Sequence, residues 1–177
     1  VVLIQRGGHA MVKMLVRLHQ PLVLRSMPPL RGVGREPAAE VAALQRIGVA
    51  QLLGLGGVDT LGQLANVKGV IVEAVPRSGT AVLNADDELC LKMADYTKAK
   101  RIAYVTLDSS HELVREHIRA GGAACVLEQG INGDMITIYD QGSHIPLLWT
   151  HLIPATLDGK ARFNVQNAMF GALMAWT

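Results

Sequence analysis

Cysteines and aromatic residues are scarce in this 177-residue chain, which has two cysteines, two phenylalanines, two tryptophans and three tyrosines. Cys90 and Cys125 form no CxxC pair, which argues against a disulfide framework and against a thiolate zinc site. No apolar run approaches the ~20 residues of a membrane-spanning helix, so the sequence predicts none. These absences favour a reducing, cytoplasmic setting.

Charge is also sparse, and it is unevenly distributed. The net charge is +2, yet residues 1–46 hold seven Lys or Arg against two acidic residues, together with four of the seven prolines. Such a shift in composition is typical of a boundary. No aromatic residue lies among these basic residues to form a stacking platform. We therefore expect neither nucleic acid nor a membrane surface as a partner.

Apolar residues make up half of the chain and charged residues 18%. This composition excludes a wholly disordered protein, and the length suits one compact domain. Hydrophobic patterning predicts strands at 80–83, 101–107 and 123–128, a hairpin of 135–139 with 144–148, and helices at 36–53, 61–75, 86–96, 109–119 and 161–176. The alternation predicts an α/β fold with a mostly parallel sheet, flanking helices and an edge β-hairpin.

Capping residues set the predicted starts of three helices. Asp59 or Thr60 is expected to cap the helix that follows it. The three acidic residues at 86–88 suit the positive end of the next helix dipole. Ser109 and Ser110 offer caps for the helix that ends at the glycine pair 121–122.

Two short segments resemble the central ATP-binding domain of the Mur ligase family. They are residues 67–87 (VKGVIVEAVPRSGTAVLNADD) and residues 156–168 (TLDGKARFNVQNA). Within that family the segments LGLGGVDTLGQLANVKGVIVEAV, AVLNADD and FNVQNA, in this order, are most similar to the cyanophycin synthetase branch. The stretch RAGGAACVLEQG between them is similar to the same branch. The resemblance covers about residues 53–177.

The resemblance implies part of an ATP-dependent ligase that forms carbon–nitrogen bonds. In that family ATP phosphorylates a carboxylate, and an amine then attacks the acyl phosphate. In the cyanophycin branch arginine is joined to aspartate side chains of a polymer. The implied cofactors are ATP and Mg²⁺. The implied partners are the amino acid, the polymer carboxylate and the other domains of a parent chain, with a homo-oligomer left open.

Asn164 and Asn167 are the candidate adenine-binding residues. They lie three apart near a helix start, so both side chains can project from one face. An amide offers a donor and an acceptor together, as an adenine edge requires. The family uses this Asn-x-x-Asn pattern against the base. The alternative on spacing alone is a helix cap with a hydrogen-bonded packing residue.

Lys68 is the candidate catalytic residue, because it matches a lysine that several Mur ligases hold as a carbamate bridging magnesium. A carbamate would supply the anionic oxygen ligands that a hard cation prefers. An ordinary exposed lysine is the alternative. Asn84, Asp86 and Asp87 are interpreted as a strand end, a turn and a helix start, so no residue is assigned to a metal.

The histidines and cysteines offer little chemistry. His111 and His117 are six residues apart, which is wrong for the i, i+4 pair of a helical zinc site. His144 has no acidic or thiol partner nearby in sequence and is expected at the surface. Cys90 and Cys125 lie in apolar surroundings and are expected in the core.

Two departures from the family pattern matter. The chain contains no GxxxxGK[ST] phosphate loop, and Gln51 and Leu52 stand where the family has an Asp-His pair. We therefore expect residues 1–52 to be an atypical segment, of non-native or frame-shifted origin, and residues 53–177 to be a partial ATP-binding domain that is inactive alone. The alternatives are a fragment of another Mur-type ligase, for muropeptide or folylpolyglutamate, and a non-catalytic α/β binding module.

Overall fold

The computed structural model describes residues 3–6, 10–12 and 58–177 of the chain. The helix predicted at 36–53 and most of the predicted atypical segment 1–52 lie outside these residues. The boundary near residue 52 therefore stays a prediction. In the part of the chain that is described, no helix is long and apolar enough to cross a membrane.

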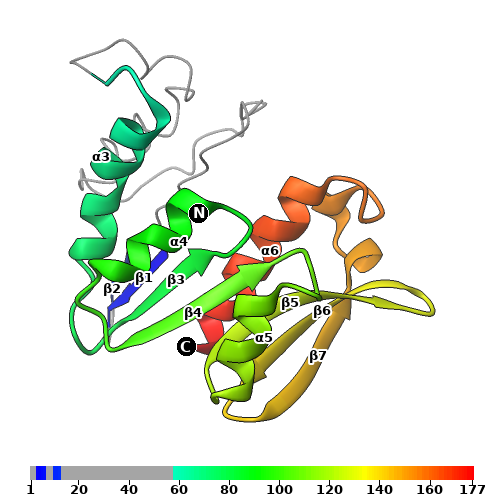
Figure 1. The fold of residues 1–177 in the computed structure, drawn as a ribbon. Helices are drawn as coiled ribbons and strands as arrows, with labels where there is room; N and C mark the ends of the chain where they lie inside the picture. Colours follow the sequence, from blue (N-terminus) through cyan, green and yellow to red (C-terminus); the bar gives the residue numbers. More distant parts are fainter. Residues whose placement is uncertain (1–2, 7–9, 13–57) are drawn as a thin grey trace.

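A seven-stranded sheet forms the centre of the molecule, in the order β2-β1-β3-β4-β5-β6-β7 (Figure 1). The strands are β1 (Leu3–Arg6), β2 (Ala10–Val12), β3 (Thr80–Asn84), β4 (Arg101–Thr106), β5 (Ala123–Gly130), β6 (Gly133–Asp140) and β7 (Ser143–Trp149). Strands β3, β4 and β5 are parallel neighbours, and the other pairs are antiparallel. Two short strands near the N-terminus, which the sequence did not predict, extend the sheet beyond β3.

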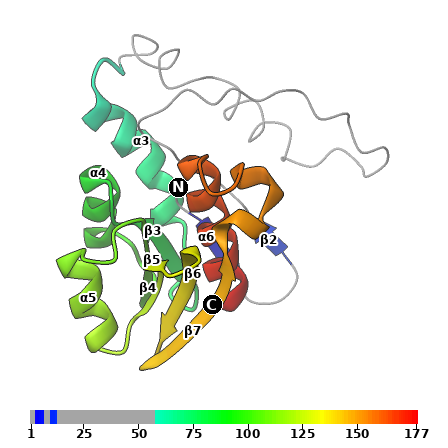
Figure 2. The ribbon, with the colours of Figure 1, turned by 90° about the vertical axis from the view of Figure 1, so that its right-hand side faces the viewer.

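Helices cover both faces of the sheet (Figures 1 and 2). One face carries α3 (Leu61–Glu73), α4 (Glu88–Leu91) with a 3₁₀ turn (Lys92–Asp95), and α5 (Glu112–Arg119), whereas α6 (Arg162–Trp176) lies on the opposite face. Two further 3₁₀ turns, Thr150–Leu152 and Pro154–Thr156, lead from β7 into α6. The predicted α/β class, with flanking helices and an edge hairpin, is confirmed, and the parallel part of the predicted sheet consists of β3, β4 and β5.

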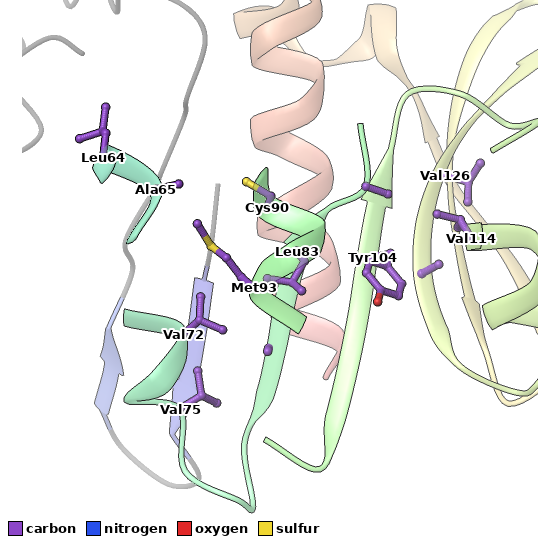
Figure 3. Close-up of a cluster of buried hydrophobic side chains, with 13 residues drawn as sticks. Leu64, Ala65, Val72, Val75, Leu83, Cys90, Met93, Tyr104, Val114 and Val126 are labelled. Carbon is purple, nitrogen blue, oxygen red and sulfur yellow. The ribbon is translucent and has the colours of Figure 1, made fainter. Parts of the chain in front are cut away.

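Each face of the sheet has its own hydrophobic layer. The layer beneath α3, α4 and α5 is shown in Figure 3, where Leu83 of β3 and Tyr104 of β4 lie among side chains of the helices. The layer beneath α6 is built around Phe170, which is fully buried. Cys90 belongs to the first layer and Cys125 to the second, so both cysteines are core residues as predicted.

Two local signals in the sequence are confirmed. Thr60 caps α3 through a capping box, since its hydroxyl accepts from the Gln63 N–H while the Gln63 side chain accepts from the Thr60 N–H. Gln141 and Gly142 join β6 to β7 with positive φ angles of 49° and 78°. Two successive positive φ values match the hairpin turn whose twist suits the flanking strands.

Two predicted helix starts are wrong. Asp86 does not enter the helix, which begins at Glu88 after the cap Asp87 and passes into the 3₁₀ turn at Lys92. Neither Ser109 nor Ser110 caps α5, whose N-cap is His111 without a side-chain cap bond. Local competition explains the second case, because the N–H and hydroxyl of Ser110 both donate to Asp108 instead.

Candidate functional site at the strand ends

The carboxyl ends of β3 and β4 carry a connected set of polar side chains. Asp86, just after β3, accepts hydrogen bonds from the Thr106 hydroxyl (2.5 Å) and from the Leu107 N–H (2.9 Å) at the end of β4. Asn84 accepts from the Asp86 N–H (3.2 Å). Crevices outside the carboxyl ends of strands are where open α/β sheets bind ligands. The candidate site is therefore the side of the sheet at which β3 and β4 end, with Asn84, Asp86 and Thr106, and we call it the strand-end edge.

Gln166 connects α6 to the strand-end edge. Its side chain is 9% exposed, and Nε2 lies 3.1 Å from Asn84 Oδ1 and 3.3 Å from Asp86 Oδ2. Sequence reasoning assigned this residue no role. A signal was nevertheless present, because Gln166 precedes Phe170 and Leu173 by four and seven residues and so falls on the buried stripe of the helix. A polar side chain at such a position needs a buried partner.

Asn164 and Asn167 lie in the first turns of α6, and both are half-buried. Asn164 donates from Nδ2 to the Ala155 carbonyl (2.5 Å), so it fastens the preceding 3₁₀ turn to the helix. This contact is the packing role that spacing alone suggested. It leaves Asn164 with one N–H and its carbonyl oxygen for a further partner.

Lys68 lies half-buried on α3. Burial lowers the pKa of its ammonium group, and the nearby Cys90 and Asp87 offset part of that effect. The lysine is thus placed near the start of α4, directly after β3. The helix that bears Lys68, α3, and the helix that bears the two asparagines, α6, cover opposite faces of the sheet (Figure 2).

The acids at the strand-end edge have structural partners. Asp87 accepts from the N–H groups of Leu89 (2.9 Å) and Cys90 (3.3 Å) as the cap of α4. Together with the bonds of Asp86, this agrees with the structural interpretation of these residues. Within the described residues, no group of three or more His, Cys, Asp or Glu is placed to hold a metal ion.

A second polar cluster surrounds Glu128 on β5. Its carboxylate accepts from Tyr139 (2.5 Å) and Thr137 (2.7 Å) of β6, and His144 Nε2 of β7 lies 3.1 Å away. His144 is exposed as predicted but does have an acidic partner. The partner was missed because it lies 16 residues away in sequence, so only the strand register brings the two together.

No protein-family model matches the chain. Among curated proteins, it is 42% identical over 149 residues to a cyanophycin synthetase of Nostoc sp., covering 82% of this chain and 15% of the relative. It is 37% identical over 163 residues to that of Synechocystis sp. (80% and 18%), and 39% identical over 124 residues to that of Geminocystis herdmanii (70% and 14%). The chain thus spans less than a fifth of the length of these relatives.

Proposed function

We propose that this chain, which is related in sequence to one segment of cyanophycin synthetases, is part of an ATP-dependent amide-forming ligase of the Mur type. In the whole protein a carboxylate would be phosphorylated by ATP and then attacked by an amino-acid amine, with arginine added to aspartate side chains. The sequence similarity supports this proposal. The chain itself has no GxxxxGK[ST] loop, so we expect no ligation by this segment alone.

The structural observation that best supports the proposal is the pair of hydrogen bonds by which Gln166 of α6 contacts the ends of the strands. These bonds hold the helix that bears Asn164 and Asn167 against the ends of β3 and β4. The second N–H and the carbonyl of the Asn164 side chain, which make no hydrogen bond with residues 58–177, and the half-buried amide of Asn167 are a donor and acceptor set that fits an adenine edge. These two residues would hold the base of ATP at this edge.

Lys68, converted to a carbamate, would bind magnesium at this site. The reaction joins the neutral lysine amine to CO₂ and releases one proton, so it requires the deprotonated side chain. Burial lowers the pKa of Lys68 and thereby raises the neutral fraction at a given pH. Magnesium would neutralise charge on the transferred phosphoryl group. Asp86 and Asp87 would keep their structural contacts.

Titration with ATP and magnesium tests the nucleotide site. We expect weak binding to the chain, and binding about 2–10-fold weaker still for Asn167→Ala, because one neutral hydrogen bond contributes roughly 0.5–1.5 kcal/mol. Asn132→Ala, in the exposed β5–β6 turn, is the matched control and should bind as the parent chain does. Calorimetry gives both affinities. Equal binding by the Asn167 variant, or none by any chain, would contradict the adenine role.

Carbon-13 NMR in labelled bicarbonate tests the role of Lys68. A carbamate carbon signal is expected that grows as the pH rises, because the amine loses its proton as the pH approaches its pKa. The lowered pKa means that Lys68 should react at lower pH than exposed lysines. Lys68→Met should abolish this signal, whereas Lys98→Met, at an exposed site, should retain it. Survival of the signal in Lys68→Met would refute the assignment.

A further inference from the structure

A cleft of about 510 Å³ runs along α5, between this helix and the sheet face formed by β5 and β6. Its near end is formed by Asp108 and His111, next to the strand-end edge, and its far end by Arg119. Val114, Ile118 and Val126 give it an apolar lining. Small-molecule sites typically occupy 300–1,000 Å³ and combine apolar walls with a few fixed polar groups.

The sheet side of the cleft presents a fixed carboxylate. Glu128 and Tyr139 both line the cleft, and the Tyr139 hydroxyl donates to Glu128. Burial alone would raise the pKa of Glu128, but the hydrogen bonds from Tyr139, Thr137 and His144 bring it below its usual value. Burial and the charge of Glu128 raise the pKa of Tyr139 to about 12. Glu128 is therefore an oriented anion at neutral pH.

The helix side of the cleft presents two guanidinium groups. Arg115 and Arg119 lie one turn apart on α5, and both are exposed. The ion pairs among the described residues are Arg101–Asp140, His144–Glu128 and Arg162–Asp134, so neither of these two arginines pairs with Glu128. Arg115 and Arg119 thus line the same cleft as Glu128 without pairing with it, while Asp108 adds a second carboxylate at the near end.

We propose that this cleft binds a small zwitterion whose two charges are separated by a short apolar chain. Its carboxylate would bind Arg115 and Arg119, which can hold carboxylates through paired N–H donors. Its cationic nitrogen would bind Glu128, and the chain between the charges would lie on Val126 and Ile118. The site is distinct from the adenine site and does not rest on it.

The test uses 6-aminohexanoate as the probe, with hexylamine and hexanoate as analogues that carry only one of the charges. Amide NMR of the chain should show shifts in α5 and in β5–β6 with 6-aminohexanoate, at about tenfold or greater affinity over either analogue. The reason is that hydrogen bonds to charged groups are the stronger class. Equal affinity for all three probes, or no shifts in these elements, would overturn the proposal.

Charge-matched variants sharpen the test. Glu128→Gln should reduce the affinity for 6-aminohexanoate to that of hexanoate, and Arg119→Gln should reduce it toward that of hexylamine, because only Arg115 then remains for the carboxylate. Glu116→Gln and Arg77→Gln make the same charge changes outside the cleft lining and should bind as the parent chain does. Arg119 is exposed, so its variant keeps the test decisive if Glu128→Gln disturbs folding. Losses of equal size in the control variants would show a nonspecific charge effect and refute the site.

Discussion

Replacing Phe170 with alanine is expected to lower the free energy of unfolding by about 3–5 kcal/mol, the range for truncating a buried phenylalanine. The ring is fully buried in the layer between α6 and the sheet, with residues of β3, β4, β5 and β6 in the same cluster. Truncation would remove the contacts of the ring and leave a cavity between α6 and the sheet. Urea unfolding followed by circular dichroism measures the change.

Phe163 provides the matched control on the same helix. It is 41% exposed, near the start of α6. Phe163→Ala makes the same chemical change with much less buried area lost, so a cost below about 1.5 kcal/mol is expected. Similar losses for the two variants would contradict the placement of Phe170 in this layer.

Replacing Asp86 with alanine is expected to cost about 1.5–3 kcal/mol, because hydrogen bonds to charged groups contribute roughly that amount. The substitution removes the acceptor of the Leu107 N–H and of one Gln166 contact, and it leaves the Thr106 hydroxyl with only the Asp108 carbonyl, 3.2 Å away. Thr106 is fully buried, so water cannot replace the lost oxygen there without rearrangement. Thermal and urea unfolding measure the loss.

The conservative variant and a double-mutant cycle locate the effect. Asp86→Asn keeps one carbonyl oxygen and should lose less stability than the alanine variant. Gln166→Leu combined with Asp86→Ala should cost less than the sum of the two single changes, because the residues share a hydrogen-bond network. Glu116→Ala, on the exposed part of α5, should change stability by less than about 0.5 kcal/mol. Strict additivity would argue that Gln166 and Asp86 do not interact.

The class of fold could be predicted because its signals are local. Thr60 and Gln63 form a capping box three residues apart, and Gln141-Gly142 specifies the hairpin turn. The apolar segments of β3, β4 and β5 alternate along the chain with the helices α4 and α5. None of these signals depends on distant parts of the chain. The resemblance of the Lys68 and Asn164-x-x-Asn167 segments to a ligase family came from several motifs in order.

The details of the candidate site could not be predicted because they depend on register and on packing across the sheet. Gln166 meets Asn84 and Asp86 from 80 or more residues away. Asp86 was expected at the turn into a helix, but nothing in the sequence indicated that its carboxylate would accept hydrogen bonds from the end of β4. Sequence spacing indicates which side chains share one element, but not which elements meet at one edge.

Because each face of the sheet has its own hydrophobic layer, the two cysteines can report separately on local unfolding of the two layers. Cys90 lies under the α3–α4–α5 layer and Cys125 under α6. Burial raises the pKa of the Cys90 thiol to about 11 and that of Cys125 to about 12. Both thiols therefore resist alkylation while the protein is folded, since the thiolate is the nucleophile. Their separate alkylation rates would show whether the two faces of the sheet open together or one before the other.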